Sequence, residues 1–161
     1  MSTSAFIGLG ANLADPGAQV LRALDELAHL PRCALVARSS LWRSAAVGYA
    51  DQPEFINAIA QLDSGLTADE LLDALQRVET THGRVRSFAN APRTLDLDLL
   101  LFGDEVRATP RLTLPHPRMH ERAFVLKPLL EIAPDAQIPG HGSAADCLGA
   151  LAGQPCEKVG G

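Results

Sequence analysis

Apolar and polar residues along this chain follow two different periods, which together predict an α+β fold. Extended segments are expected where apolar residues alternate or run together between turn signals, in 4–13, 34–42, 54–62 and 95–101. Helices are expected after Asp15-Pro16 and after the capping box of Thr67 and Glu70. The order strand, helix, strand, strand, helix, strand is typical of the ferredoxin-like fold. We therefore predict that residues 1–161 form one domain around a four-stranded antiparallel sheet, with helices packed on it.

The C-terminal part is predicted as extra, smaller elements that cover one end of this sheet. A short return strand is expected at 106–107. Phe124-Val125-Leu126 is interpreted as an extended segment, and 128–132 as a short helix that starts at its proline. Ser143 is interpreted as the cap of a last helix, and the tail beyond Gly153 is expected to fray.

The segment from Leu95 to Gly103 places two acidic residues within an otherwise apolar run. Side chains alternate faces along a strand, so one face carries Leu95, Leu97, Leu99 and Leu101. Asp96 and Asp98 share the opposite face, about 7 Å apart by the rise of a strand. Unpaired buried charge is costly, so this face needs arginine, Mg²⁺ or open water beside it. The pattern alone leaves these three interpretations open.

Charge is distributed unevenly along the chain, whose net charge is −5. Residues 83–127 hold seven arginines and one lysine against five acids, a net of +3, while both flanking parts are acidic. An arginine cluster within an acidic protein argues against general nucleic-acid binding and favours a small anionic ligand.

The chain shows no sign of a membrane or secreted protein. No run approaches the roughly 18 apolar residues of a membrane span, and no secretory leader is visible. Cys33, Cys147 and Cys156 are odd in number and widely spaced, which fits neither a disulfide framework nor a zinc site. We therefore expect a cytoplasmic protein that contacts neither membrane nor nucleic acid.

The segment 83–93 combines three arginines with small residues and has no apolar period, so we expect an exposed loop. A cationic loop next to paired acids has the composition of a lid over a metal–phosphate complex. The helix before it presents Leu72, Gln76 and Glu79 on one face by their spacing. That face is interpreted either as a solvated edge or as part of the same site.

Three other places also have two interpretations each. Asn57 shares a face of its strand with Phe55 and Ile59, as either a satisfied edge amide or a ligand contact. His116 lies between two prolines, which argues against zinc binding and leaves a positioned donor or a structural hydrogen bond. Gly8-x-Gly10 lacks the third glycine of a dinucleotide fingerprint and is interpreted as a turn or a close backbone approach.

Three motifs taken together resemble those of one enzyme family. They are Phe-Ile-Gly-Leu-Gly-Ala-Asn-Leu at 6–13, Pro-Arg-Thr-Leu-Asp-Leu-Asp-Leu-Leu at 92–100 and Leu-Pro-His-Pro-Arg-Met-His-Glu-Arg-Ala-Phe at 114–124. In these the chain is similar to the 6-hydroxymethyl-7,8-dihydropterin pyrophosphokinases of folate biosynthesis, from about Phe6 to Asp135. The resemblance implies a Mg²⁺-dependent enzyme that transfers pyrophosphate from ATP to the hydroxymethyl group of a reduced pterin and releases AMP.

By position in these motifs, the resemblance also implies roles for individual residues. Asp96 and Asp98 match the acids that hold two Mg²⁺ ions, and Arg84 and Arg93 match loop arginines that engage the phosphates during transfer. The matching nucleotide-binding positions are Leu72, Gln76, Glu79, Arg86, Leu99, Arg111, Thr113, His116 and Arg122. The matching pterin-binding positions are the pocket residues Ser44, Ala45 and Val47, the hydrogen-bonding Asn57, and the sandwiching pair Phe55 and Phe124.

The chain departs from some family members at two places. Where they have a tryptophan, this chain has the shorter run that contains Phe88, and Pro117 replaces a tyrosine after His116. Two other functions stay open: a module that binds nucleotide or RNA without turnover, and a metal-dependent nucleotidyl or phosphotransferase with another acceptor. Few aromatic residues and a negative net charge disfavour RNA binding. The oligomeric state stays open, with a monomer as the working assumption.

Overall fold

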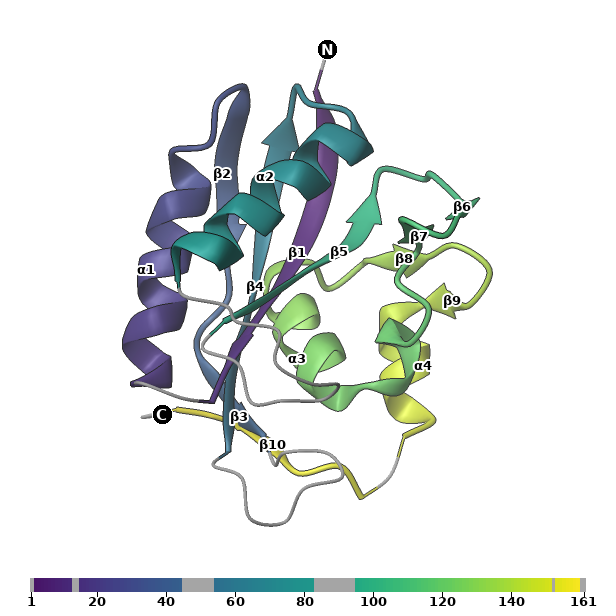
Figure 1. Ribbon diagram of the computed structural model, residues 1–161. Helices are drawn as coiled ribbons and strands as arrows, with labels where there is room; N and C mark the ends of the chain where they lie inside the picture. Colours follow the sequence, from purple (N-terminus) through teal and green to yellow (C-terminus); the bar gives the residue numbers. More distant parts are fainter. Residues whose placement is uncertain (1, 13–14, 45–53, 83–94, 152, 160–161) are drawn as a thin grey trace.

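The computed structural model describes residues 2–12, 15–44, 54–82, 95–151 and 153–159 (Figure 1). Its first part consists of β1 (Thr3–Ala11), α1 (Pro16–Ala28), β2 (Cys33–Arg38), β3 (Trp42–Ser44), β4 (Phe55–Ser64), α2 (Ala68–Thr81) and β5 (Asp96–Phe102). Its second part consists of β6 (Arg107–Ala108), β7 (Thr113–Leu114), the 3-10 helix η1 (Met119–Glu121), α3 (Ala123–Ile132), β8 (Gln137–Ile138), β9 (Gly142–Ser143), α4 (Ala144–Gly149) and β10 (Cys156–Lys158). None of the helices in these ranges is long and apolar enough to cross a membrane.

The central sheet confirms the predicted fold class. β1 pairs antiparallel with β4 on one side and with β5 on the other, and β2 and β3 pair one after the other with β4. This is the ferredoxin-like order, with β10 added beside β3. The single strand predicted for 34–42 is wrong, because Ser39 divides it into β2 and β3. The Ser39 hydroxyl accepts a hydrogen bond from the backbone N–H of Ile59 at 2.9 Å, in place of a backbone carbonyl.

Two apolar cores, one on each face of the sheet, hold the helices. On one face α1 and α2 pack against alternate residues of β1, β4 and β5, and on the other α3 packs against Ile59 and Leu100. In Figure 1 α1 and α2 lie together along the strands, and α3 and α4 lie together on the side of β6 to β9. Phe6 is the residue of β1 that packs against the second core. The next positions on that face of β1 are Gly8 and Gly10, which carry no side chain.

A bulge in β5 reverses one sequence prediction. Ile7 pairs with Leu99, but Phe6 pairs with Leu101, so Leu100 is an extra residue in β5. The leucines before the bulge face the first core as predicted, whereas Leu101 lies in the second core together with Leu100. The prediction for Leu101 is wrong because one inserted residue exchanges the two faces of the strand after it.

The helix α3 begins earlier than the sequence indicates. The predicted extended segment Phe124-Val125-Leu126 is helical, and Pro128 lies inside α3 instead of at its start. A short apolar run cannot by itself distinguish a strand from a buried helix. Here Val125, Leu126 and Leu129 are buried at helical spacing against the second core, which decides the outcome.

The prediction of a frayed tail beyond Gly153 is also wrong. β10 pairs antiparallel with β3, with Cys156 opposite Ser44. From α3, Lys127 Nζ donates a hydrogen bond to the Cys156 carbonyl at 2.8 Å. These contacts come from parts of the chain distant in sequence, so composition near the tail could not indicate them.

Candidate active site

Two glycines of β1 carry no side chain on the face of the sheet opposite α1 and α2. Gly10 pairs with Asp96 of β5 on one side and with Asn57 of β4 on the other, so these three residues form one row on one face. Gly8 pairs in the same way with Asp98 and with β4. Because Gly10 has no side chain, Asp96 and Asn57 flank bare backbone there. At Gly8 the Leu100 side chain is close, since a Cβ on Gly8 would lie 3.3 Å from Leu100 Cδ1. We call these five residues, Gly8, Gly10, Asn57, Asp96 and Asp98, the open strip.

Asp96 and Asp98 lie on the accessible face of β5, as strand alternation predicts. Asp96 is half-buried and Asp98 is exposed, while Leu97 between them is buried in the first core. Among the described residues, no group of three or more His, Cys, Asp or Glu side chains could hold a metal ion. Asp96 and Asp98 supply carboxylate oxygens, which Mg²⁺ prefers, whereas zinc sites more often use histidine and cysteine.

Glu79 of α2 contacts β5 between these two acids. The residue is only 4% exposed, and its Oε2 accepts a hydrogen bond from the backbone N–H of Leu97 at 2.8 Å. β5 lies at the edge of the sheet, so the carboxylate binds an N–H that points away from β1. Of the other residues predicted on this helix face, Leu72 is half-buried and Gln76 is exposed. The end of α2 is thereby fixed beside the acid pair.

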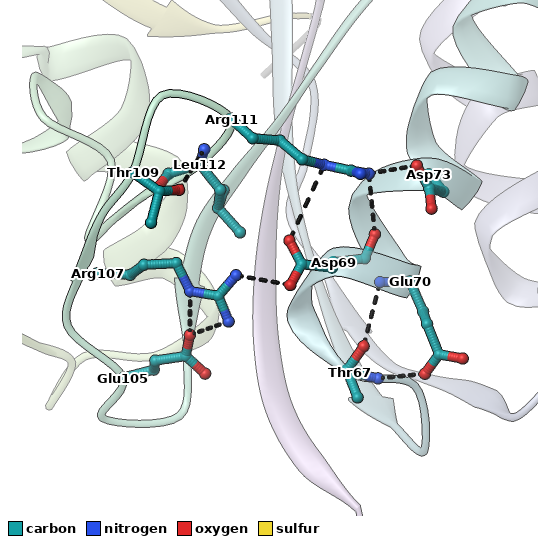
Figure 2. Close-up of polar contacts among 9 residues, drawn as sticks. All are labelled: Thr67, Asp69, Glu70, Asp73, Glu105, Arg107, Thr109, Arg111 and Leu112. Atoms are coloured by element: carbon teal, nitrogen blue, oxygen red, sulfur yellow. Dashed lines mark hydrogen bonds and ion pairs between the residues drawn. The ribbon is translucent and has the colours of Figure 1, made fainter.

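Arg111 joins the turn between β6 and β7 to the start of α2 (Figure 2). Its Nη2 donates to the Asp73 carboxylate and, at 3.3 Å, to the backbone carbonyl of Asp69, and its Nε lies 3.9 Å from Asp69 Oδ1. Arg107 Nη1 donates to Asp69 Oδ2 at 2.8 Å, and Arg107 Nε donates to Glu105 at 2.7 Å. The contacts of Arg111 use the Nε and Nη2 side of its guanidinium, which leaves Nη1 to face another acceptor.

His116 is held in one tautomer by its neighbours. Its backbone N–H donates to the Leu100 carbonyl at 2.9 Å, and its Nδ1 accepts from the backbone N–H of Arg118 at 3.2 Å. Partial burial, together with the charges of Arg122 and Arg118, lowers the pKa of His116 to about 4. At neutral pH the ring is therefore uncharged and carries its hydrogen on Nε2. Nε2 is the donor that this side chain can offer to a ligand.

Arg122 and Phe124 are in contact at the start of α3. The guanidinium carbon of Arg122 lies 5.5 Å from the centre of the Phe124 ring, which is a cation–π distance. Both side chains are half-buried. A residue predicted to bind the nucleotide and one predicted to bind the pterin therefore lie side by side.

Asn57 is buried, and Ser44 of β3 orients its amide. Asn57 Nδ2 donates a hydrogen bond to Ser44 Oγ at 2.8 Å. A Cβ built on Gly10 would lie 3.3 Å from Asn57 Oδ1 and 3.9 Å from Phe55 Cδ1. The amide nitrogen is thus satisfied within the sheet, while the amide oxygen lies beside Gly10 on the open strip, next to the Phe55 ring.

The structure describes only some of the other predicted site residues. Leu99 is buried in the first core, so only its backbone, at the sheet edge, can face a ligand. Thr113 is half-buried in β7, opposite Ala108. The predicted loop 83–93 lies outside the described residues, and so do its Arg84, Arg86, Phe88 and Arg93. The predicted pocket residues Ala45 and Val47 also lie outside the described residues.

The place of Gly8 and Gly10 in the middle of the sheet is the main feature that the sequence interpretation missed. Both lie inside β1, so the interpretation as a turn is wrong and the close backbone approach remains. Their spacing of two residues within an apolar strand was the available signal, because it places both gaps on one face.

Comparisons with known proteins point to one enzyme family. The model of the family described as 7,8-dihydro-6-hydroxymethylpterin-pyrophosphokinase (HPPK) matches residues 6–134. A relative from Pseudomonas aeruginosa, named 2-amino-4-hydroxy-6-hydroxymethyldihydropteridine pyrophosphokinase, is 46% identical over 156 residues, which cover 97% of this chain and 96% of the relative. A relative of the same name from Haemophilus influenzae is 46% identical over 136 residues, 84% of this chain and 85% of its own.

A solved structure supports the fold independently. The crystal structure of wild-type Plasmodium falciparum HPPK-DHPS with pteroate superposes with a TM-score of 0.73 over 92% of this chain, at 11% sequence identity. This chain spans 42% of that longer protein, and the similarity at this identity concerns the fold alone. The family model and the two bacterial relatives carry the further conclusion: this chain belongs to the 7,8-dihydro-6-hydroxymethylpterin-pyrophosphokinase family.

Proposed function

We propose that the protein carries out the reaction of its family on the open strip, between the acids of β5 and Asn57 of β4. That reaction transfers pyrophosphate from ATP to the hydroxymethyl group of 6-hydroxymethyl-7,8-dihydropterin, gives AMP and the pterin diphosphate, and belongs to folate biosynthesis. The observation that carries this placement is the row Asp96, Gly10, Asn57, which sets acid and amide on one face with bare backbone between them.

Asp96 and Asp98 are the proposed ligands of two Mg²⁺ ions. Both carboxylates lie on the accessible face of one strand and supply oxygen, the donor that Mg²⁺ prefers, while water and phosphate oxygens would complete the coordination. When bound, Mg²⁺ would neutralise phosphate charge and lower the pKa of the pterin hydroxyl group. The hydrogen bond from Leu97 to Glu79 supports the backbone between the two acids, and so supports the spacing of their carboxylates.

The nucleotide is proposed to bind beside β5, against α2 and the segment 111–122. Its proposed contacts are Leu72, Gln76, Glu79, Arg86, Arg111, Thr113, His116, Arg122 and the backbone of Leu99. The support is chemical: His116 offers a neutral Nε2–H donor, and Arg111 and Arg122 offer charged donors for anionic oxygens. Neutral and charged donors together suit a triphosphate, which presents several acceptor oxygens.

The pterin is proposed to bind at the other end of the open strip. Phe55 and Phe124 are the proposed aromatic walls, and Asn57 the group that reads the hydrogen-bonding edge of the ring. Ser44, Ala45 and Val47 complete the proposed pocket. The support is the buried Asn57 amide, whose oxygen lies beside Gly10 and the Phe55 ring.

In the transfer, the pterin hydroxyl oxygen attacks the β-phosphorus of ATP while the bond between this phosphorus and the α,β-bridging oxygen breaks. The chain contributes mainly placement and charge. Bare backbone at Gly10 allows a substrate to approach the sheet closely there. Arg84 and Arg93 are the proposed catalytic arginines that neutralise phosphate charge during transfer. We expect Arg93→Ala to slow the chemical step more than it weakens ATP binding.

The test measures AMP formation from ATP, Mg²⁺ and the reduced pterin in variants of the two acids. Asp96→Asn and Asp98→Asn should each lower turnover by about a hundredfold or more, because each removes a charged ligand at the reacting phosphates. The free energy of unfolding should change by less than about 1 kcal/mol, since neither side chain lies in a core. Asp104→Asn, in the exposed turn after β5, is the control and should retain wild-type turnover.

Two outcomes would overturn this proposal. One is a different product pattern: AMP formed from ATP without the pterin, or ADP formed in its presence. The other is loss of the folded state in the Asp96 and Asp98 variants, which would make both acids structural.

We also propose that residues 1–161 act as one domain, as a monomer in the cytoplasm. The single domain is supported by both cores sharing one sheet, since Ala58 and Ile59 of β4 face opposite cores. The cytoplasm is supported by the use of ATP as co-substrate. Light scattering on the purified protein tests the monomer.

A further inference from the structure

The two proposed aromatic walls of the pterin site lie on different elements. Phe55 is the first residue of β4, and Phe124 lies in the first turn of α3. A flat ring fits between two such walls only at one separation, so affinity depends on how firmly α3 is held against the β3–β4 part of the sheet. The residues that hold α3 in place can therefore affect pterin affinity without contact with the pterin.

Glu131, in the last turn of α3, makes a three-donor contact with β3 and the residues before it. Its Oε1 accepts from the Ser40 backbone N–H at 3.0 Å and from Trp42 Nε1 at 2.9 Å. Its Oε2 accepts from the Ser40 hydroxyl at 2.5 Å. Both carboxylate oxygens are therefore engaged by the short segment that divides β2 from β3.

The charge state of Glu131 suits this role. Partial burial acts to raise its pKa, but the hydrogen bonds from Ser40 and Trp42 and the nearby Lys158 outweigh it and lower the pKa. Lys158 Nζ lies 3.8 Å from Glu131 Oε2 and 5.7 Å from the centre of the Trp42 ring. The side chain is thus an anion at neutral pH, with its donors arranged around it.

The residues that Glu131 contacts are neighbours of Asn57, which lies on the proposed pterin side of the open strip. Trp42 pairs with Asn57 across β3 and β4, and Ser44, two residues further along β3, accepts the hydrogen bond from the Asn57 amide. Lys127, one helical turn before Glu131 on α3, also ties α3 to β10, the strand paired with β3, through the Cys156 carbonyl. Glu131 and Lys127 of α3 therefore contact β3 and β10, the two strands on the side of β4 that carries Asn57.

We propose that Glu131 is a positioning residue for pterin binding, which ties α3 to β3 and so sets the separation of Phe124 from Phe55 and Asn57. Glu131 acts through Ser40 and Trp42 and has no contact with the substrate. The inference rests on the proposed placement of the pterin between these two aromatic residues.

The test compares binding of two ligands to the full-length protein. The dissociation constants of 6-hydroxymethyl-7,8-dihydropterin and of a non-hydrolysable ATP analogue with Mg²⁺ are measured by calorimetry for wild type and Glu131→Gln. A glutamine keeps one acceptor oxygen and loses the other, so the tie to β3 is weakened without loss of volume. We expect pterin binding to weaken by about tenfold and binding of the ATP analogue to change by less than about twofold.

Two further variants separate positioning from a general loss of stability. Glu157→Gln makes the same charge change on β10, where Glu157 contacts the exposed Arg43, and should bind both ligands as wild type does. Trp42→Phe removes one of the three donors, and its effect on pterin affinity should not add to that of Glu131→Gln, because both act through one contact. Chemical unfolding of each variant shows that the binding assays are made on folded protein.

The outcomes are distinct from those of the proposed function. If wild type fails to bind the pterin, the proposed site itself is wrong. If wild type binds it and Glu131→Gln binds it equally well, or loses both ligands to the same degree, the positioning role of Glu131 is overturned. A shift of the Asn57 side-chain amide signals in the NMR spectrum of folded Glu131→Gln is the expected sign of the proposed path, and unchanged signals would contradict it.

Discussion

Gly10 and Asn57 are cross-strand partners, and the Asn57 amide oxygen lies where Gly10 lacks a side chain. A methyl group at position 10 would lie 3.3 Å from that oxygen, which requires the amide to move by a few tenths of an ångström. The backbone at Gly10 belongs to a regular strand, so an alanine can adopt its conformation. The effect of a substitution here should therefore concern the site more than the fold.

Gly10→Ala should weaken pterin binding by about tenfold, because the displaced Asn57 amide no longer meets the ring edge in the proposed geometry. The free energy of unfolding should fall by less than about 1 kcal/mol. Calorimetric titration with the pterin and chemical denaturation measure the two quantities. Gly17→Ala is the control, since a Cβ there meets its nearest neighbour, Leu41, at an ordinary 3.9 Å. Unchanged pterin affinity in Gly10→Ala would show that the bare backbone is not needed.

Local signals in the sequence suffice for much of the fold. The capping box at the start of α2 is present as predicted: Glu70 N–H donates to Thr67 Oγ1 at 3.2 Å and Thr67 N–H donates to Glu70 Oε1 at 2.9 Å. Ser143 also caps α4 as predicted, through the N–H of Asp146. Caps depend on residues three positions apart, so they can be recognised without knowledge of the fold.

Features that depend on distant partners could not be predicted in this way. The extra residue Leu100 in β5 is defined by its register against β1, and β10 is an ordered strand only because β3 lies beside it. The face of Asp96 and Asp98 followed from strand alternation alone. That Glu79 binds the backbone between them did not, because the register of α2 against β5 is a tertiary property.

Glu79 is expected to contribute to stability as well as to the site. Glu79→Ala leaves the Leu97 N–H without its acceptor beside a buried strand, which should cost about 1–3 kcal/mol of the free energy of unfolding. Glu79→Gln retains an acceptor oxygen and should cost less. Urea denaturation of both variants provides the comparison. Equal losses in both would mean that the charge of Glu79, and not the hydrogen bond from Leu97, stabilises the fold.

Asp73 is expected to orient Arg111 for the nucleotide. Asp73→Asn removes the charge that engages Arg111 Nη2, while the contacts with Asp69 remain. Both side chains of the pair are about half exposed, and exposed ion pairs contribute roughly 0.2–1 kcal/mol. The KM for ATP should therefore rise by up to about fivefold with the KM for the pterin unchanged.

Steady-state kinetics with each substrate varied in turn measures this effect. Asp25→Asn, whose long ion pair with Arg38 lies on the surface of α1, is the matched control and should leave both constants unchanged. A decrease of the KM for ATP in Asp73→Asn would reverse the interpretation, because it would mean that Asp73 competes with the nucleotide for Arg111.

His116 should make the stability of the protein depend on pH in a defined range. The pKa of His116 is lowered from 6.5 to about 4 in the folded state, by partial burial and then by Arg122 and Arg118. Between these two values the unfolded chain binds a proton that the folded chain does not, so acidification favours unfolding. The free energy of unfolding contributed by this group should therefore decrease as the pH falls from about 6.5 towards 4, and be unaffected above 6.5.

His116→Gln tests this assignment, because glutamine does not titrate in this range. The variant should lose part of the decrease that wild type shows between pH 6.5 and 4, as measured by urea denaturation at several pH values. His29→Gln is the control, since His29 is exposed at the end of α1 and should leave the wild-type profile unchanged. A wild-type profile in His116→Gln would contradict a neutral His116 in the folded protein. It would also remove the support for Nε2–H as a neutral donor to the nucleotide.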